Sequence, residues 1–118
     1  MAIIGVFGKS KGFTMLPNNI LDILMQIDVD PDIQRVLNFL WRHAYGYRKN
    51  EVTAKLSYIS EKTGLSSELV LQIMNLLQRN NVICYKLPGG FSGSEQYLII
   101  LNENFEEWNK HNLNTIPY

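Results

Sequence analysis

The chain has 118 residues and a mass of 13.6 kDa, which suits one compact domain and excludes two independent cores. Hydrophobic residues make up 46% of the sequence, so the composition is that of a globular protein and not of a disordered one. Eleven Lys and Arg balance eleven Asp and Glu, which excludes nucleic-acid attraction by overall charge and leaves only local basic surfaces.

The first half of the chain predicts two helices. We divide the chain into a leader 1–16, a domain 17–110 and a C-terminal tail 111–118. Apolar residues recur at helical spacing after Pro17, which predicts a helix over Pro17–Ile27. Asp30 is suited to cap a second helix over Pro31–Tyr45, with proline at its first position. Residues 47–54 are expected to form a loop, with a short strand at Ala54–Leu56.

The centre of the chain predicts a helix-turn-helix. One helix is expected over Ser57–Thr63 and ends at Gly64, and a second is expected over Ser66–Asn80 with Ser66 as its cap. Its predicted inward stripe consists of Val70, Ile73, Met74 and Leu77.

A β-hairpin is predicted directly after these helices. Its strands are Val82–Leu87 and Glu95–Leu101, joined by a turn rich in Pro, Gly and Ser, and a short helix is expected around Glu103–Asn109. Helices followed by such a hairpin within about 90 residues are the layout of a winged helix. The expected fold is therefore an α+β winged helix-turn-helix.

No group of residues predicts catalysis, a metal site or a cofactor. The stretch Gly5–Ser10 lacks the first glycine of a phosphate-binding loop, since Ile3 stands there. Asp30 and Asp32 suit the start of a helix better than a calcium loop, because Ile33 and Phe39 occupy the required Gly and Glu positions. We expect a protein that is not an enzyme.

The single cysteine, Cys84, excludes an intramolecular disulfide and fits a reducing compartment. Its place in the middle of a predicted strand suggests a small buried side chain. No run approaches the roughly 20 apolar residues of a transmembrane helix. The sequence therefore predicts a cytoplasmic protein that does not interact with membranes.

The predicted second helix of the helix-turn-helix carries polar residues suited to double-stranded DNA. Ser67, Gln72 and Asn75 are the candidates for base contacts, because amide side chains match adenine edges. The candidates for phosphate contacts are the hydroxyl of Ser66 and the basic residues Arg42, Arg48, Lys49, Lys55 and Lys62.

An alternative interpretation of the same scaffold is a protein-interaction module. Leu69, Leu71 and Leu76 lie on the predicted outer and flanking sides of this helix, and Phe91 at the wing tip extends the set. A contiguous apolar patch of this kind often marks a partner surface. The partner would be a second copy of the chain or a replication protein.

Three blocks of residues resemble a known family. They are Gly12-Phe13-Thr14 with Pro17-Asn18, Tyr45-Gly46-Tyr47 with Arg48-Lys49, and Leu56-Ser57 with Ile59 and Thr63-Gly64-Leu65-Ser66. The chain from Gly12 to about Lys110 resembles the N-terminal domain of phage replication protein O and related phage or plasmid replication initiators. The resemblance implies a winged helix that binds repeated sites at a replication origin. The family's recognition helix usually carries Arg or Lys where this chain has Ser67, Glu68 and Leu69.

Overall fold

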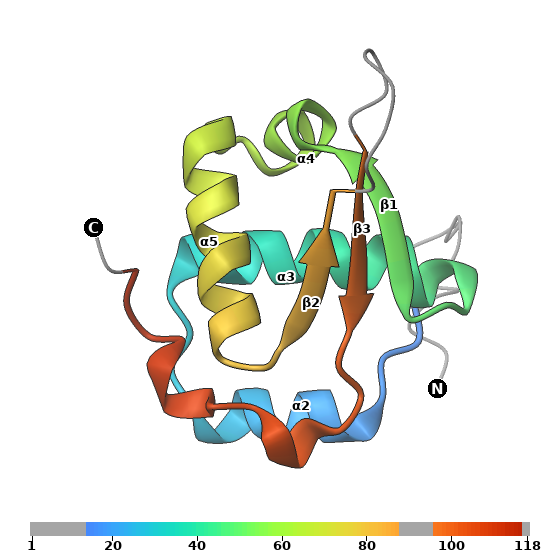
Figure 1. Ribbon diagram of the computed structural model, residues 1–118. Helices are drawn as coiled ribbons and strands as arrows, with labels where there is room; N and C mark the ends of the chain where they lie inside the picture. The colour runs from blue at the N-terminus through green and yellow to red at the C-terminus, as the bar shows by residue number, and fades with distance from the viewer. Residues whose placement is uncertain (1–13, 88–95, 117–118) are drawn as a thin grey trace, which may run out of the picture.

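The computed structural model describes residues 14–87 and 96–116, which form an α+β arrangement (Figure 1). Four α-helices and one three-stranded antiparallel sheet make up this part of the chain. The helices are α2 (Asn18–Gln26), α3 (Pro31–Ala44), α4 (Leu56–Thr63) and α5 (Ser67–Arg79). The strands are β1 (Glu51–Lys55), β2 (Ile83–Lys86) and β3 (Gln96–Leu101), and the short 3₁₀ turns are η1 (Tyr45–Tyr47), η2 (Phe105–Glu107) and η3 (Lys110–Asn112).

The predicted helix boundaries are confirmed to within a residue or two, because their capping residues act locally. One carboxylate oxygen of Asp30 accepts hydrogen bonds from the backbone N–H groups of Asp32 and Ile33, at 2.8 and 3.3 Å. The Ser66 hydroxyl accepts from the backbone N–H of Leu69 at 3.2 Å. Gly64 ends α4 in the left-handed conformation with φ of 75°.

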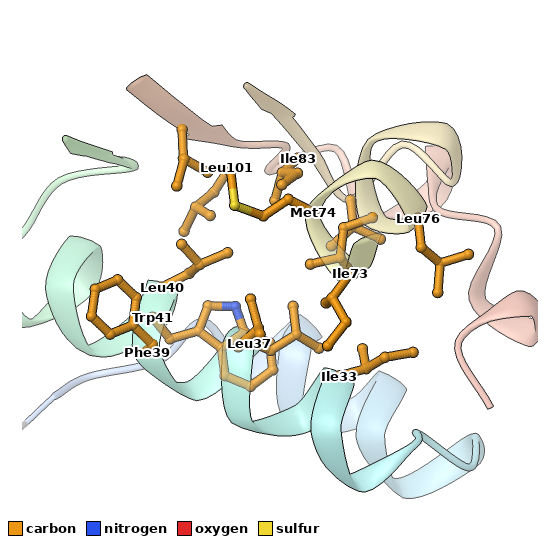
Figure 2. Packing of buried hydrophobic residues seen from close by; sticks show 14 of the residues in the cluster. Ile33, Leu37, Phe39, Leu40, Trp41, Ile73, Met74, Leu76, Ile83 and Leu101 are labelled. Carbon is orange, nitrogen blue, oxygen red and sulfur yellow. The ribbon is translucent and has the colours of Figure 1, made fainter. Parts of the chain in front are cut away.

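The core lies between α3, α5 and the inner face of the sheet. Figure 2 shows Leu37 and Leu40 of α3 pointing toward Met74 of α5 and toward Ile83 and Leu101 of the sheet. The predicted inward stripe of α5 is confirmed, since Val70, Ile73, Met74 and Leu77 have no exposed surface. Fully burying one such side chain contributes about 1.5–3 kcal/mol, so this stripe determines which side of α5 faces outward.

The sheet has the strand order β1-β3-β2, so the first strand joins the edge of the hairpin (Figure 1). The prediction of a loop up to Ala54 is wrong, because β1 already begins at Glu51 and pairs with β3 from Glu51↔Ile100 to Lys55↔Gln96. Val52 and Ala54 are buried while the residues between them are exposed. This alternation was visible in the sequence, but its partner strand lies more than forty residues away.

The prediction that Cys84 is buried is also wrong. Cys84 is exposed, whereas its neighbour Ile83 is 3% exposed. The register pairs Cys84 with Ile100 and Ile83 with Leu101, which turns Ile83 to the inner face and Cys84 to the outer face.

The chain after β3 packs below the sheet and then beside α5 (Figure 1). The short helix predicted around Glu103–Asn109 is wrong, because only the turns η2 and η3 form here. The indole N–H of Trp108 donates to the carbonyl of Asn102 at 3.0 Å, and the backbone N–H of Asn109 donates to the carbonyl of Asn80 at 3.0 Å. In this segment, these hydrogen bonds take the place of the i to i−4 backbone hydrogen bonds of an α-helix. Leu113 and Ile116 are buried in the same core.

None of the helices in the described residues is both long enough and apolar enough to span a bilayer.

Candidate nucleic-acid interface

An outer stripe of polar residues runs along the side of α5 that faces away from the core. Its members are Glu68, Gln72, Asn75 and Arg79, all exposed and spaced three or four residues apart. A surface hollow of about 400 Å³ is lined by Gln72, Asn75, Gln78 and Arg79. The base candidates Gln72 and Asn75 therefore lie side by side on one exposed surface. Ser67 is only half-exposed and lies at the beginning of the helix.

Two amides of α5 are connected to strand β2 through Tyr85. The hydroxyl of Tyr85 donates to Oδ1 of Asn75, and the backbone N–H of Tyr85 donates to Oε1 of Gln78 at 2.8 Å. The ring of Tyr85 packs edge-on against Tyr97 of β3, with centroids 5.6 Å apart. Neither Tyr85 nor Gln78 was among the predicted site residues. The only sequence signal was the alternation along β2 that turns Tyr85 to the inner face.

The Tyr85 hydroxyl remains a donor at ordinary pH. Partial burial of the ring, followed by the nearby Tyr97 phenol, raises the pKa of Tyr85 above its usual value. Because the Tyr85 phenol is protonated, it donates its hydrogen to the carbonyl oxygen of Asn75. This hydrogen bond holds the oxygen toward β2. Its amide NH₂ is the donor end of the same side chain.

Lys55 and Lys86 form a first basic group, on strands that lie on either side of β3. Lys55 pairs with Gln96 and Lys86 pairs with Leu98, and both lysines are exposed on the outer face of the sheet. Both stand at the same end of the sheet, because Lys55 is the last residue of β1, Lys86 is the last residue of β2, and their partners lie in the first half of β3. Lys55 was among the predicted phosphate contacts, and Lys86 was not.

The other predicted basic residues form a second group around the end of α3. Lys49 lines a hollow together with His43 and Tyr47, and Lys62 on α4 lies with Nζ 5.6 Å from the ring centroid of Tyr58. Arg48 adopts a left-handed conformation with φ of 59° directly after η1. Arg42 is exposed near the end of α3. The structure thus divides the basic residues among the predicted phosphate contacts between two groups, and Ser66 at the start of α5 belongs to neither.

Ser66 acts as the N-cap of α5, so its hydroxyl oxygen is already an acceptor for a helix N–H. The same hydroxyl has one hydrogen to donate, and the first turn of a helix is favourable for an anion. This position is consistent with a phosphate contact at the start of the outer stripe.

The predicted leucine surface on α5 is not continuous. Leu76 is 5% exposed and lies on the side of α5 that faces the C-terminal segment, so its place in an exposed surface is wrong (Figure 2). Leu69 is half-buried and packs against the core, which leaves the half-exposed Leu71. Phe91 lies outside the described residues. Association through the remainder of this surface stays a prediction.

Among residues 14–87 and 96–116, no three His, Cys, Asp or Glu side chains converge as a group that could hold a metal ion. The two histidines are far apart in the chain, and His43 is instead part of an aromatic cluster with Phe39 and Tyr58.

Comparison with known proteins gives one match. The family model for bacteriophage replication protein O matches residues 8–108, which is most of the chain. The matched range includes all four α-helices and the three strands, and therefore both basic groups. No curated protein and no solved structure matches the chain significantly.

Proposed function

The chain belongs to the bacteriophage replication protein O family, and on that premise we propose that it binds duplex DNA at a replication origin through α5. The order α3, β1, α4, α5, β2, β3, with β1 at the edge of the hairpin, is consistent with a winged helix in which α5 enters the major groove. The role is binding and not catalysis, and it requires no cofactor. Its place is the cytoplasm of the infected bacterium.

The observation that carries this proposal is the pair of amides on the outer stripe of α5. Gln72 and Asn75 lie on the exposed side of a helix whose opposite side is fully buried. Gln72 can donate and accept at the same time, which matches the N6 and N7 atoms of adenine in the major groove, while Asn75, whose Oδ1 accepts from Tyr85, offers its NH₂ to an acceptor such as N7. Tyr85 limits the rotation of Asn75, so less side-chain entropy is lost when a base is bound.

The cations for phosphate contacts are Arg79 on the stripe and two lysines of the sheet. Lys55 and Lys86 are the last residues of β1 and β2, the strands on either side of β3, and Arg79 lies at the end of the stripe. The start of α5 adds the Ser66 hydroxyl and the positive end of the helix dipole. These contacts position the helix on DNA, and they carry no sequence information.

The test begins with selection of bound sites from a random duplex library, followed by anisotropy titrations on the selected site. We expect Gln72→Ala to lower the preference for one base pair by about 1–3 kcal/mol while binding to random duplex is retained. The double variant Lys55→Gln with Lys86→Gln should instead weaken binding to every sequence equally.

Met25→Ala is the control, because Met25 is 78% exposed and belongs to α2, which contributes none of the proposed DNA contacts. This variant should bind like the unchanged protein. Full affinity for the selected site in both the Gln72 and the double lysine variants would contradict the assignment of the interface to α5 and the ends of β1 and β2.

A further inference from the structure

Two exposed tyrosines mark a surface that the duplex contacts of α5 do not use. Tyr47 in η1 is 65% exposed and Tyr58 on α4 is 39% exposed. Among the large hydrophobic residues that are exposed in the described part of the chain, they are the two aromatic ones. Most aromatic rings of this size lie in a core or an interface, so their exposure calls for a partner.

The ring of Tyr58 is held in place by neighbours underneath it. His43 stacks on the buried ring of Phe39 at 4.2 Å between centroids, and Tyr58 packs edge-on against His43 at 5.8 Å. The hydroxyl of Tyr58 lies 3.5 Å from Nε2 of His43, while Nδ1 of His43 lies 3.0 Å from the carbonyl oxygen of Phe39. An aromatic side chain that is already ordered loses little entropy when a ligand stacks on it.

His43 also connects Tyr58 to a hollow in front of Tyr47. This hollow of about 310 Å³ is lined by His43, Tyr47, Lys49, Glu51, Val52 and Thr53. Its volume lies at the lower end of the range of roughly 300–1,000 Å³ that is typical of small-molecule sites. A flat ring system such as a single nucleobase suits this space better than a folded segment of protein.

Two cations lie close to these rings. Lys49 lines the hollow, and Nζ of Lys62 lies over the Tyr58 ring, 5.6 Å from its centroid. We name five residues the aromatic–basic surface: His43, Tyr47, Lys49, Tyr58 and Lys62. Glu51 contributes one carboxylate to the hollow, and the two lysines exceed its charge by one positive charge. Exposed rings with interspersed cations are the usual chemistry of single-stranded nucleic-acid binding.

We propose that the aromatic–basic surface binds single-stranded DNA, with Tyr47 and Tyr58 stacking on unpaired bases and Lys49 and Lys62 contacting phosphates. Bases in a duplex are covered on both faces by their neighbours, so stacking on these rings requires an unpaired strand. The hollow lined by Tyr47 and the hollow on α5 have no lining residue in common. The chain thus has one surface for duplex DNA and a second for a separated strand, which goes beyond the proposed duplex binding.

The experiment measures anisotropy of a labelled thymidine oligomer of about 12 nucleotides, a length within the usual site size, titrated with the 118-residue chain. Tyr47→Ala and Tyr58→Ala should each weaken this binding at least about fivefold, while Tyr47→Phe, which keeps the ring, should stay within about twofold. Lys49→Gln should reduce the salt slope by about 0.7, whereas Tyr47→Ala should leave the slope unchanged.

Separate controls distinguish this proposal from duplex binding by α5. Arg79→Gln should weaken duplex binding and leave the thymidine oligomer bound as before, and the tyrosine variants should show the reverse. The proposal is overturned if the unchanged protein does not bind the oligomer at low salt, if Tyr47→Phe loses as much as Tyr47→Ala, or if labelled polyglutamate binds equally well. The last result would assign the surface to an acidic protein partner.

Discussion

At the scale of single residues, the contact between Tyr85 and Asn75 joins two side chains that lie ten positions apart. Asn75 is an exposed residue on a helix, and on its own it would sample several rotamers. The phenol of Tyr85 selects one of them. Tyr85→Phe removes only the hydroxyl that holds Asn75 in place. This substitution should therefore weaken the proposed contact between Asn75 and a base, although Asn75 itself is unchanged.

Alkaline titration tests the two tyrosines whose ionisation the fold opposes. Burial first, then the charge of Glu103 and the hydrogen bond to it, raises the pKa of Tyr45 well above its ordinary value of 10.0, and burial also raises the pKa of Tyr85. In the unfolded chain both phenols lose their protons near the ordinary value, while the folded protein retains them. The contribution of these two groups to stability should thus be constant below that pH and fall above it.

The measurement is the urea midpoint at about pH 9 and about pH 11, compared between the unchanged protein and Tyr45→Phe. The phenylalanine variant should lose less of its stability between the two values, because it has one fewer group that resists ionisation in the folded state. An equal loss in both proteins would show that Tyr45 does not contribute.

Gly64 gives a second prediction at this scale. Its φ of 75° is the left-handed conformation, and a Cβ at this position would meet no atom within 4 Å. The cost of Gly64→Ala therefore comes from the backbone alone and should be about 1–2 kcal/mol. Gly64→Asn should lose less, since Asn tolerates this conformation. Chemical unfolding of the three proteins checks the order.

At the scale of elements, a network of asparagines attaches the C-terminal segment to the end of α5. Asn80 is 5% exposed, its Nδ2 donates to the carbonyl of Leu76 at 2.8 Å, and its Oδ1 accepts from Asn112 at 3.0 Å. Asn102 donates to the carbonyl of Asn81 at 2.7 Å and so connects β3 to the same place. These bonds bring Leu113 and Ile116 into the core and cover Leu76.

Asn80→Ala should accordingly destabilise the protein by about 1–3 kcal/mol, because it removes the hydrogen bonds that the buried Asn80 amide makes to the Leu76 carbonyl and to Asn112. Asn114→Ala is the matched control, since Asn114 is exposed and its hydrogen bond within the described residues is to the neighbouring Thr115, and it should change stability by less than about 0.5 kcal/mol. Thermal unfolding compares the two, and equal melting temperatures would refute a role for Asn80.

At the scale of the whole molecule, charge is balanced in number but divided in space. The chain has as many acidic as basic residues, and the exposed lysines of residues 14–87 and 96–116 fall into one group at the ends of β1 and β2 and another on the aromatic–basic surface. In the proposed duplex binding, association would thus be guided by a few local charges and not by a general field, which predicts a small number of phosphate contacts.

Salt titration of duplex binding gives the number of these contacts. With Lys55, Lys86 and Arg79 as the cations, the slope of log K against log salt should be about −3, and binding should weaken accordingly between about 50 and about 200 mM salt. A slope near −6 or steeper would mean that the second basic group contacts the duplex as well.

The sequence alone determined most of the helical architecture, because helix signals act over a few residues. The caps Asp30 and Ser66, the terminator Gly64 and the apolar spacing along α5 predicted the helices and the inward side of α5, and they placed Gln72 and Asn75 on its outer stripe. The family was also evident from short blocks of residues.

Contacts between distant segments decided the rest. Strand β1 exists because β3 pairs with it, Cys84 is exposed because the register of β2 turns Ile83 inward, and Leu76 is covered because the asparagine network holds the C-terminal segment against α5. The meeting of Tyr47, His43 and Tyr58 depends in the same way on how α4 packs against α3. Local patterns specify elements, whereas the side chains that elements bring together depend on long-range packing, for which a single sequence carries no local signal.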